Sequence, residues 1–256
     1  MTTPPDPGAN TGEQAKDVCV VIGAGEGVGG AIARAFAAAG HPVVVTRRAR
    51  NLDQLEALAA GIRASGGTAY PFGVDARSEE ETTALFDNIE ANIGPIGIVV
   101  FNIGANVHFG IRETTARVFS KVWEMACFAG FLAGREAARV MAPRGRGTII
   151  FTGATASIRG GKGFAAFASA KAGLRALAQS MARELGPEGI HVAHVICDGA
   201  IDGVFTRSRF DDVTDLLEED VILKPDDIAQ NYLWLHQQPR SAWTHEIDLR
   251  PWRETW

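Results

Sequence analysis

The chain has 256 residues, 46% of them hydrophobic, which is enough for one sizeable core and suits a single α/β domain. Its net charge of -5 argues against a nucleic-acid or membrane-surface partner. The three cysteines, Cys19, Cys127 and Cys197, lie far apart without metal-ligand spacing, so we expect no metal site and a reducing, cytoplasmic location.

Short apolar runs alternate with helical patterns along the chain. In chain order, the first half predicts a strand at Val18–Ile22, a helix at Gly27–Ala39, a strand at Pro42–Thr46, a helix at Leu52–Ala64, a strand at Thr68–Val74 and a helix at Ser78–Ile93. The second half predicts a strand at Ile96–Phe101, a helix at Ala116–Met141, a strand at Thr148–Thr152, a helix at Ala165–Glu184 and a strand at Ile190–Ile196. Continuously apolar strands suit a sheet that helices cover on both faces. The alternation therefore predicts a single-domain, doubly wound parallel sheet of the Rossmann type.

The remaining segments frame this domain. Residues 1–16 are rich in Pro, Gly, Thr and Asp and lack an apolar stretch, so we expect a disordered tail, not a signal peptide. Residues 17–256 make up the predicted domain, and no apolar run in it reaches the roughly 18 residues of a membrane span. Residues 198–220 follow the last of these strands, where such sheets place ligands and lids.

A glycine-rich loop joins the first predicted strand to the first helix. Its residues are Gly23, Ala24, Gly25, Glu26, Gly27, Val28 and Gly29. Glycines allow a tight turn and let backbone N–H groups approach a pyrophosphate at a helix N-terminus. The alternative is a tight strand–helix turn that binds nothing.

The spacing Gly23-x-x-x-Gly27-x-Gly29 resembles that of the short-chain dehydrogenases/reductases. Further matches are Asp75 after strand three, Asn102-Ile103-Gly104 after strand four, Lys171 in the Tyr-x-x-x-Lys motif and Asp198-Gly199 in place of Pro-Gly after strand six. The resemblance spans about Val18 to Gly203. It is to an atypical subgroup with Phe in place of Tyr, because Phe167 stands four residues before Lys171.

The end of the second strand bears on the choice of nucleotide. It carries Arg47 and Arg48, where a carboxylate would bind the ribose diol of NAD. Two guanidiniums favour the 2′-phosphate of NADP(H), while NAD(H) stays possible if the arginines are solvated or stack on adenine. By the resemblance, further cofactor contacts come from Asp75, Ala76, Asn102, Gly104, Thr152, Lys171, Gly199 and Ile201.

In the family, an Asn, a Ser, a Tyr and a Lys cooperate in proton transfer. By the resemblance, the first three positions hold Cys127, Ala154 and Phe167, and only Lys171 is retained. Thr155 and His108 are candidate substitutes, the first as a hydroxyl and the second as a proton donor near neutral pH. The alternative for His108 is a partly exposed loop residue without a catalytic role. Lys171 is expected to hold the ribose, and a desolvated lysine acting as the acid is the other interpretation.

These patterns predict an NAD(P)(H)-dependent short-chain oxidoreductase with a small-molecule substrate, either a carbonyl compound or an activated alkene. The alternative is a nucleotide-binding pseudoenzyme that acts as a sensor or partner subunit, and a scaffold without cofactor is a third interpretation. The helices at Ala116–Met141 and Ala165–Glu184 resemble those that join subunits in the family, so we expect a homodimer or homotetramer.

Overall fold

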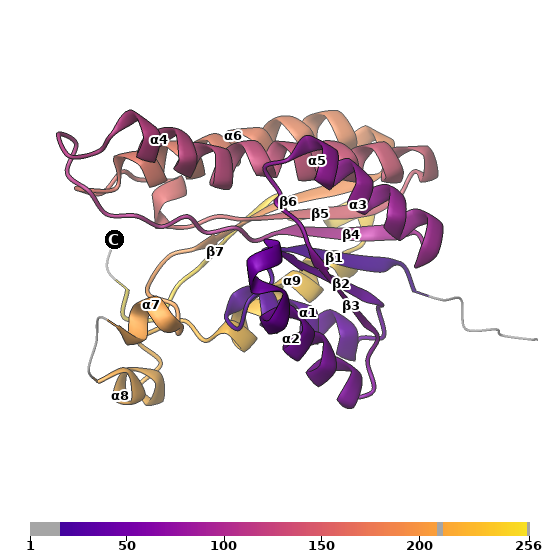
Figure 1. The fold of residues 1–256 in the computed structure, drawn as a ribbon, viewed down its shortest axis with the longest axis horizontal. Coiled ribbons are helices and arrows are strands. Elements are labelled where there is room, and N and C mark those ends of the chain that lie inside the picture. The colour runs from indigo at the N-terminus through magenta and orange to yellow at the C-terminus, as the bar shows by residue number, and fades with distance from the viewer. Residues whose placement is uncertain (1–15, 209–211, 255–256) are drawn as a thin grey trace, which may run out of the picture.

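The computed structural model describes residues 16–208 and 212–254. Within these residues, seven parallel strands form one sheet in the order β3-β2-β1-β4-β5-β6-β7 (Figure 1). The strands are β1 (Val18–Ile22), β2 (Val43–Arg47), β3 (Ala69–Gly73), β4 (Ile96–Phe101), β5 (Gly147–Thr152), β6 (Ile190–Cys197) and β7 (Glu246–Leu249). Successive strands are added on one side of β1 as far as β3, and then on the other side from β4 to β7. The strand order therefore reverses between the two central strands, β1 and β4.

Helices cover both faces of the sheet, as the continuously apolar strands predicted (Figure 1). One layer contains α3 (Glu79–Asn92), α4 (Ala116–Trp123), α5 (Ala129–Met141) and α6 (Ala165–Leu185). The other contains α1 (Val28–Ala38), α2 (Leu52–Ala64) and α9 (Pro225–Gln237). The short helices α7 (Val204–Arg207) and α8 (Val213–Glu218) lie beyond the carboxyl ends of the strands.

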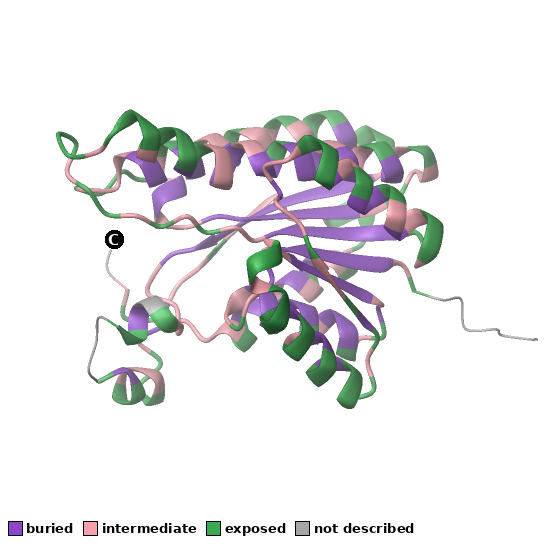
Figure 2. Ribbon diagram, viewed as in Figure 1, coloured by how far each residue is buried: buried purple, intermediate pink, exposed green. Residues whose placement is uncertain are grey.

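Two hydrophobic clusters sit on opposite faces of the sheet, and alternate strand residues feed them. In β1, Cys19 and Val21 join the cluster under α1 and α9, whereas Val18, Val20 and Ile22 join the one under α5 and α6. All five residues are buried, and Figure 2 shows the central strands buried along their length. The residues at the carboxyl ends are therefore held on a rigid base.

The predicted fold class is confirmed, and the predicted elements differ from the structure mainly at their ends. The predicted helix at Ala116–Met141 is divided by a π-helical turn at Glu124–Phe128. The loop predicted at 198–220 contains α7 and α8, and α9 and β7 were not predicted. Residues 1–15 of the predicted tail and 209–211 of the predicted loop lie outside the described residues. Among the described residues, no helix is long and apolar enough to cross a membrane.

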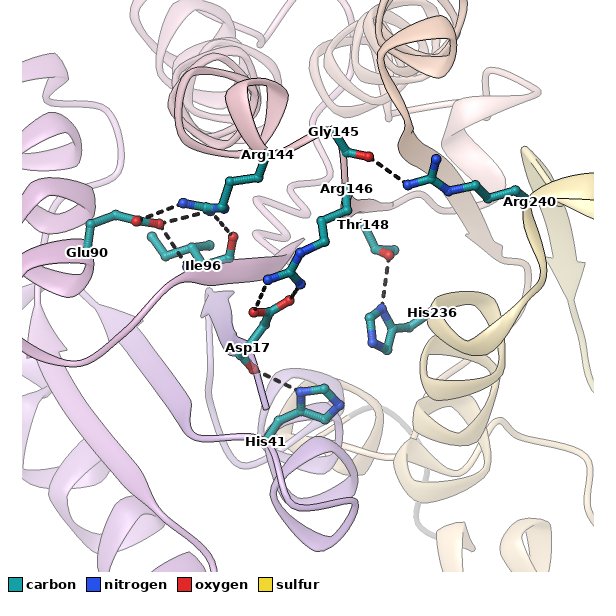
Figure 3. Close-up of polar contacts among 10 residues, drawn as sticks. All are labelled: Asp17, His41, Glu90, Ile96, Arg144, Gly145, Arg146, Thr148, His236 and Arg240. Atoms are coloured by element: carbon teal, nitrogen blue, oxygen red, sulfur yellow. Dashed lines mark hydrogen bonds and ion pairs between the residues drawn. The ribbon is translucent and has the colours of Figure 1, made fainter. Parts of the chain in front are cut away.

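Polar contacts fix the edge of the sheet where the strands begin (Figure 3). Arg146 forms an ion pair with Asp17, and Arg144 donates to Glu90 at 2.9 Å and to the Ile96 carbonyl at 2.6 Å. In the same region the His236 ring lies 3.0 Å from the Thr148 hydroxyl, and the His41 ring lies 2.9 Å from the Asp17 carbonyl oxygen. These contacts stabilise the amino-terminal end of the sheet, which lies opposite the carboxyl ends of the strands.

The histidines at this edge make stability depend on pH. Burial lowers the pKa of His236 from 6.5 to about 4, with the nearby His41 as the next cause. The folded ring stays neutral while the unfolded chain takes up a proton below pH 6.5, so acid favours unfolding. We expect His236 to contribute stability above pH 6.5 and to lose it as the pH falls toward 4, by about 1.4 kcal/mol per pH unit at most.

Urea unfolding of the wild type and of His236→Gln between pH 7.5 and 4.5 measures this contribution. His236→Gln should show a shallower fall in unfolding free energy across that window. His108→Gln, which alters an exposed loop histidine, is the matched control and should keep the wild-type slope. Equal slopes for all three proteins would contradict the prediction.

Candidate active site

A cleft of about 200 Å³ opens at the carboxyl ends of the central strands, at the point where the strand order reverses. Ligands of doubly wound sheets bind at such a point. It is lined by residues that follow or end β1, β2, β3 and β4 and by one residue of the π-helical turn: Ile22, Gly23, Thr46, Arg47, Arg48, Asn51, Val74, Asp75, Ala76, Arg77, Asn102, Ile103, Gly104, Ala105 and Met125.

The glycines between β1 and α1 fall into two groups. Gly23 has a φ of 93°, and a β-carbon there would lie 2.8 Å from the carbonyl oxygen of Asn102. A β-carbon on Gly29 would collide with the Gly23 backbone, so the fold itself needs these two glycines. Gly27 differs, because no atom of the described residues lies within 4 Å of a β-carbon built there. That open space at the start of α1 fits a pyrophosphate that approaches the backbone N–H groups.

Two arginines stand beside this loop at the end of β2. The Arg47 guanidinium carbon lies 3.5 Å from the position of a β-carbon on Gly25, and Arg47 also donates to Gln54. Arg48 is the next residue, and both arginines line the cleft. A doubly negative 2′-phosphate on the nucleotide ribose would meet two cations here. An unphosphorylated ribose diol carries no charge that would need them.

Asp75 lines the cleft after β3, where the resemblance placed it. Its carboxylate accepts two hydrogen bonds from the Arg77 guanidinium, one of them at 2.9 Å. These hydrogen bonds hold the pKa of the Asp75 carboxyl below its usual range. The N-cap of α3 is Ser78, whose side chain accepts from the Glu81 backbone N–H, so Asp75 does not serve as that helix cap.

Lys171 is buried on α6, with 2% of its surface exposed. Its amine donates to the backbone carbonyls of Thr152 at 2.7 Å and of Ile103 at 3.0 Å, at the ends of β5 and β4. Burial lowers the pKa of Lys171 from 10.5 to about 8. Asn102, also at the end of β4, donates its side-chain amide to the Gly23 carbonyl at 3.2 Å and so joins the glycine loop to the fourth strand.

Phe167 lies one turn before Lys171 on α6, and its ring centroid is 6.0 Å from the Lys171 amine. It is 8% exposed and packs in an apolar cluster with Cys127, while Ala154 packs against the same cluster. Burial raises the pKa of the Cys127 thiol, so that this group keeps its proton at neutral pH. The three positions together form an apolar wall and not a set of proton donors.

The Thr155 hydroxyl does not stand free as a substitute for a serine. It donates to the carboxylate of Asp198 at 2.5 Å, and Asp198 is fully buried at the end of β6. Arg159 donates to the same carboxylate twice at 3.1 Å, and Arg250 lies 3.2 Å from it. This network ties the segment after β5 to the segments after β6 and β7.

Within the described residues, neither His108 nor either tyrosine forms a hydrogen bond with the Lys171 amine. His108 is exposed and packs edge-on against Phe164, with 4.8 Å between ring centroids. The Tyr232 hydroxyl on α9 bonds the Thr152 hydroxyl at 2.8 Å, on the opposite face of the sheet from α6. Tyr70 is on β3, at the far edge of the sheet. Neither tyrosine supplies the phenol that is missing at position 167.

Apart from Thr152 and Lys171, which are described above, the structure places the predicted cofactor residues in three groups. Those that line the cleft are Gly23, Arg47, Arg48, Asp75, Ala76, Asn102 and Gly104. Gly25, Glu26, Gly27, Val28 and Gly29 form the adjoining loop and the start of α1. Gly199 lies against Pro251 and Ile201 pairs with Leu223, and neither residue lines the cleft. Sequence reasoning missed Asn51, Arg77 and Met125, which only the folded arrangement brings there.

Comparison with known proteins assigns the family. Residues 17–214 match the family described as short chain dehydrogenase. The chain is a member of the short-chain dehydrogenase family. The resemblance read from the glycine spacing is thereby confirmed at the level of the family, and its members are oxidoreductases. Within the described residues, no group of three or more His, Cys, Asp or Glu side chains is arranged to hold a metal ion.

Several relatives resemble this short-chain dehydrogenase over most of their length. A short-chain dehydrogenase from Rhodopseudomonas palustris is 50% identical, with a TM-score of 0.79 over 92% of this chain and 99% of the other. A metagenomic short-chain oxidoreductase solved in complex with NADP is 27% identical, with a TM-score of 0.78 over 92% of this chain and 97% of the other. The 3-oxoacyl-acyl-carrier-protein reductase MabA of Mycobacterium avium is 31% identical over 74% of this chain and 69% of that protein.

Proposed function

We propose that this short-chain dehydrogenase is an NADP(H)-dependent oxidoreductase that reduces a carbonyl or activated-alkene substrate through an altered proton path. The observation that carries the proposal is the cleft, in which the open face of Gly27 adjoins Arg47 and Arg48. A metagenomic relative solved with NADP supports the choice of cofactor. We also propose that the chain belongs to a subgroup with Phe in place of Tyr, because Phe167 and Lys171 share one face of α6.

Each part of the cofactor has residues that suit it. The glycine loop and the start of α1 would hold the pyrophosphate, Arg47 and Arg48 the 2′-phosphate, and Asp75 the adenine. Lys171, with its amine beside the end of β4, would hold the nicotinamide ribose. NADPH supplies the hydride when bound. Ala76, Gly104, Thr152, Gly199 and Ile201 stay proposed contacts from the family resemblance.

The chain's own contribution to the reaction would be an apolar wall beside the Lys171 ammonium. Phe167, Cys127 and Ala154 exclude water from the space beside Lys171, which strengthens any electrostatic interaction there. A substrate with an apolar body and one polar oxygen suits this lining. His108 and Thr155 are not proposed again as substitutes, since one is exposed and the other is bound to Asp198.

Fluorescence titration with NADPH and with NADH tests the proposal. We expect the wild type to bind NADPH at least about tenfold more tightly, because two guanidiniums would pair with the extra phosphate. Arg48→Ala should weaken NADPH binding and leave NADH binding nearly unchanged. Arg50→Ala, two residues further along and exposed, is the control and should bind both as the wild type does. Equal affinity of the wild type for both nucleotides would contradict the NADP(H) preference.

A nucleotide-binding protein without turnover is the second candidate, favoured by the apolar wall of Phe167, Cys127 and Ala154. It shares the predicted NADPH binding. It differs in predicting no NADPH oxidation above background with a panel of ketones, diketones and enones, and steady oxidation with any of them would exclude it.

We also make proposals about the oligomeric state, the cellular location and a substrate lid. We propose a homodimer or homotetramer, supported by exposed aromatic side chains on α4 and α5, which are Phe119, Trp123 and Phe131. We keep a cytoplasmic location as a proposal, supported by three free, buried cysteines. Residues 198–220 are proposed as a lid over the substrate, since α7 and α8 lie beyond the strand ends (Figure 1).

A further inference from the structure

The side chains beside Phe167 leave few sources of a proton for the reaction. Phe167 and Ala154 carry no acidic proton, and burial raises the pKa of the Cys127 thiol. Thr155 directs its hydroxyl proton at the Asp198 carboxylate, 2.5 Å away. A proton for the reduced substrate therefore has to come from another group at this end of the sheet.

The ammonium of Lys171 lies at this end of the sheet and has one N–H donor that is not used in a hydrogen bond within the described residues. A lysine has three N–H donors, and two of them go to the carbonyls of Thr152 and Ile103. Within the described residues, the third N–H has no hydrogen-bond partner, although only 2% of Lys171 is exposed to solvent. Ile103 lines the cleft, so the ammonium is one hydrogen bond away from a residue of the cleft wall.

The surroundings of Lys171 make it a better acid than an ordinary lysine. The titratable groups that act on it are the thiols of Cys127 in the π-helical turn and Cys197 on β6, and the imidazole of His194 on β6. None of these groups is a carboxylate, and burial outweighs the opposing effect of the two thiols on the pKa of Lys171. The apolar ring of Phe167 stands on the side where a phenol would share the proton.

We propose that Lys171 is the general acid of the reaction, in place of the missing phenol. This inference rests on the proposed function. A bound NADPH would supply the hydride to the substrate carbon and leave as NADP⁺. The carbonyl or enolate oxygen, which would gain the displaced π electron pair, would then take a proton from the Lys171 ammonium. The neutral amine then regains a proton from water, so charge and atoms balance over one turnover.

Lysine NMR on the free protein tests this acidity without any turnover. With 13C at Cε, the five lysines Lys16, Lys121, Lys162, Lys171 and Lys224 give separate titrations. We expect one signal to titrate near pH 8 and to vanish in Lys171→Arg but not in the exposed control Lys121→Arg. A Lys171 signal with a pKa near the ordinary value of about 10.4 would overturn the inference.

Kinetics with NADPH and diacetyl as the probe substrate supply the second readout. Turnover should fall about tenfold per pH unit above pH 8, and Lys171→Arg should lose about 100-fold or more of it at saturating NADPH. Wild-type turnover in Lys171→Arg, or a flat profile to pH 10, would overturn the acid role. NADPH binding without turnover of the wild type would also overturn it, whereas failure to bind NADPH would defeat the proposed function itself.

Discussion

Replacing Phe167 with tyrosine is expected to raise NADPH-dependent reduction of diacetyl about 100-fold. The new phenol would stand on the same face of α6 as Lys171, whose amine is 6.0 Å from the present ring centroid. A positioned acid of this kind contributes about 10²–10⁴-fold, and the wild type already has a weaker donor in the ammonium, so we expect the lower end. Stopped-flow or steady-state NADPH oxidation at saturating cofactor measures the change.

Phe164→Tyr is the matched control for this gain. Phe164 is the N-cap residue of α6, three positions earlier, and its ring packs edge-on against His108. The same hydroxyl added there should leave turnover unchanged. A gain in both variants, or in neither, would show that position 167 does not face the reacting oxygen.

Replacing Asp198 with alanine is expected to destabilise the fold by about 3–5 kcal/mol. The carboxylate is fully buried and is held by Thr155, Arg159 and Arg250, the last with 15% of its side chain exposed. Removing it leaves the Thr155 hydroxyl without its acceptor and takes one carboxylate from the mostly buried Arg250, which keeps its ion pair with Asp248. Urea unfolding at pH 7.5 gives the loss directly as a change in midpoint.

Asp202→Ala is the control for that loss. Asp202 also pairs with an arginine, but Arg207 has 57% of its side chain exposed, so the pair is screened by water. Exposed pairs of this kind contribute little to stability. If both variants lost the same small amount of unfolding free energy, the buried network around Asp198 would not stabilise the fold as we propose.

The central part of the fold was predictable because its signal is local. Strand β1 is buried on both faces, so its apolar run needed no knowledge of its neighbours. Strand β7 was missed for the opposite reason. Glu246–Leu249 is four residues long and partly exposed, and it is a strand because it pairs with β6, with Glu246 opposite His194. Such a pairing leaves no local pattern in the sequence.

The site shows the same division. The glycine loop and Lys171 could be located from spacing alone, since both depend on a turn or on one helix face. The fate of Thr155 could not, because its hydroxyl is bound by Asp198, 43 positions away, and the two arginines on that carboxylate come from still other segments. Burial sets the acidity of Lys171 in the same manner, through contacts that only the folded chain makes.

A crystal structure with NADPH bound tests the central claim most directly, which is that this chain keeps the cofactor cleft and has lost the usual proton donor. We predict the pyrophosphate against Gly27, the 2′-phosphate between Arg47 and Arg48, and the Lys171 amine as the nearest proton-bearing group to the nicotinamide C4 atom. A nucleotide bound elsewhere, or a hydroxyl, imidazole or carboxyl group closer to C4 than Lys171, would contradict it.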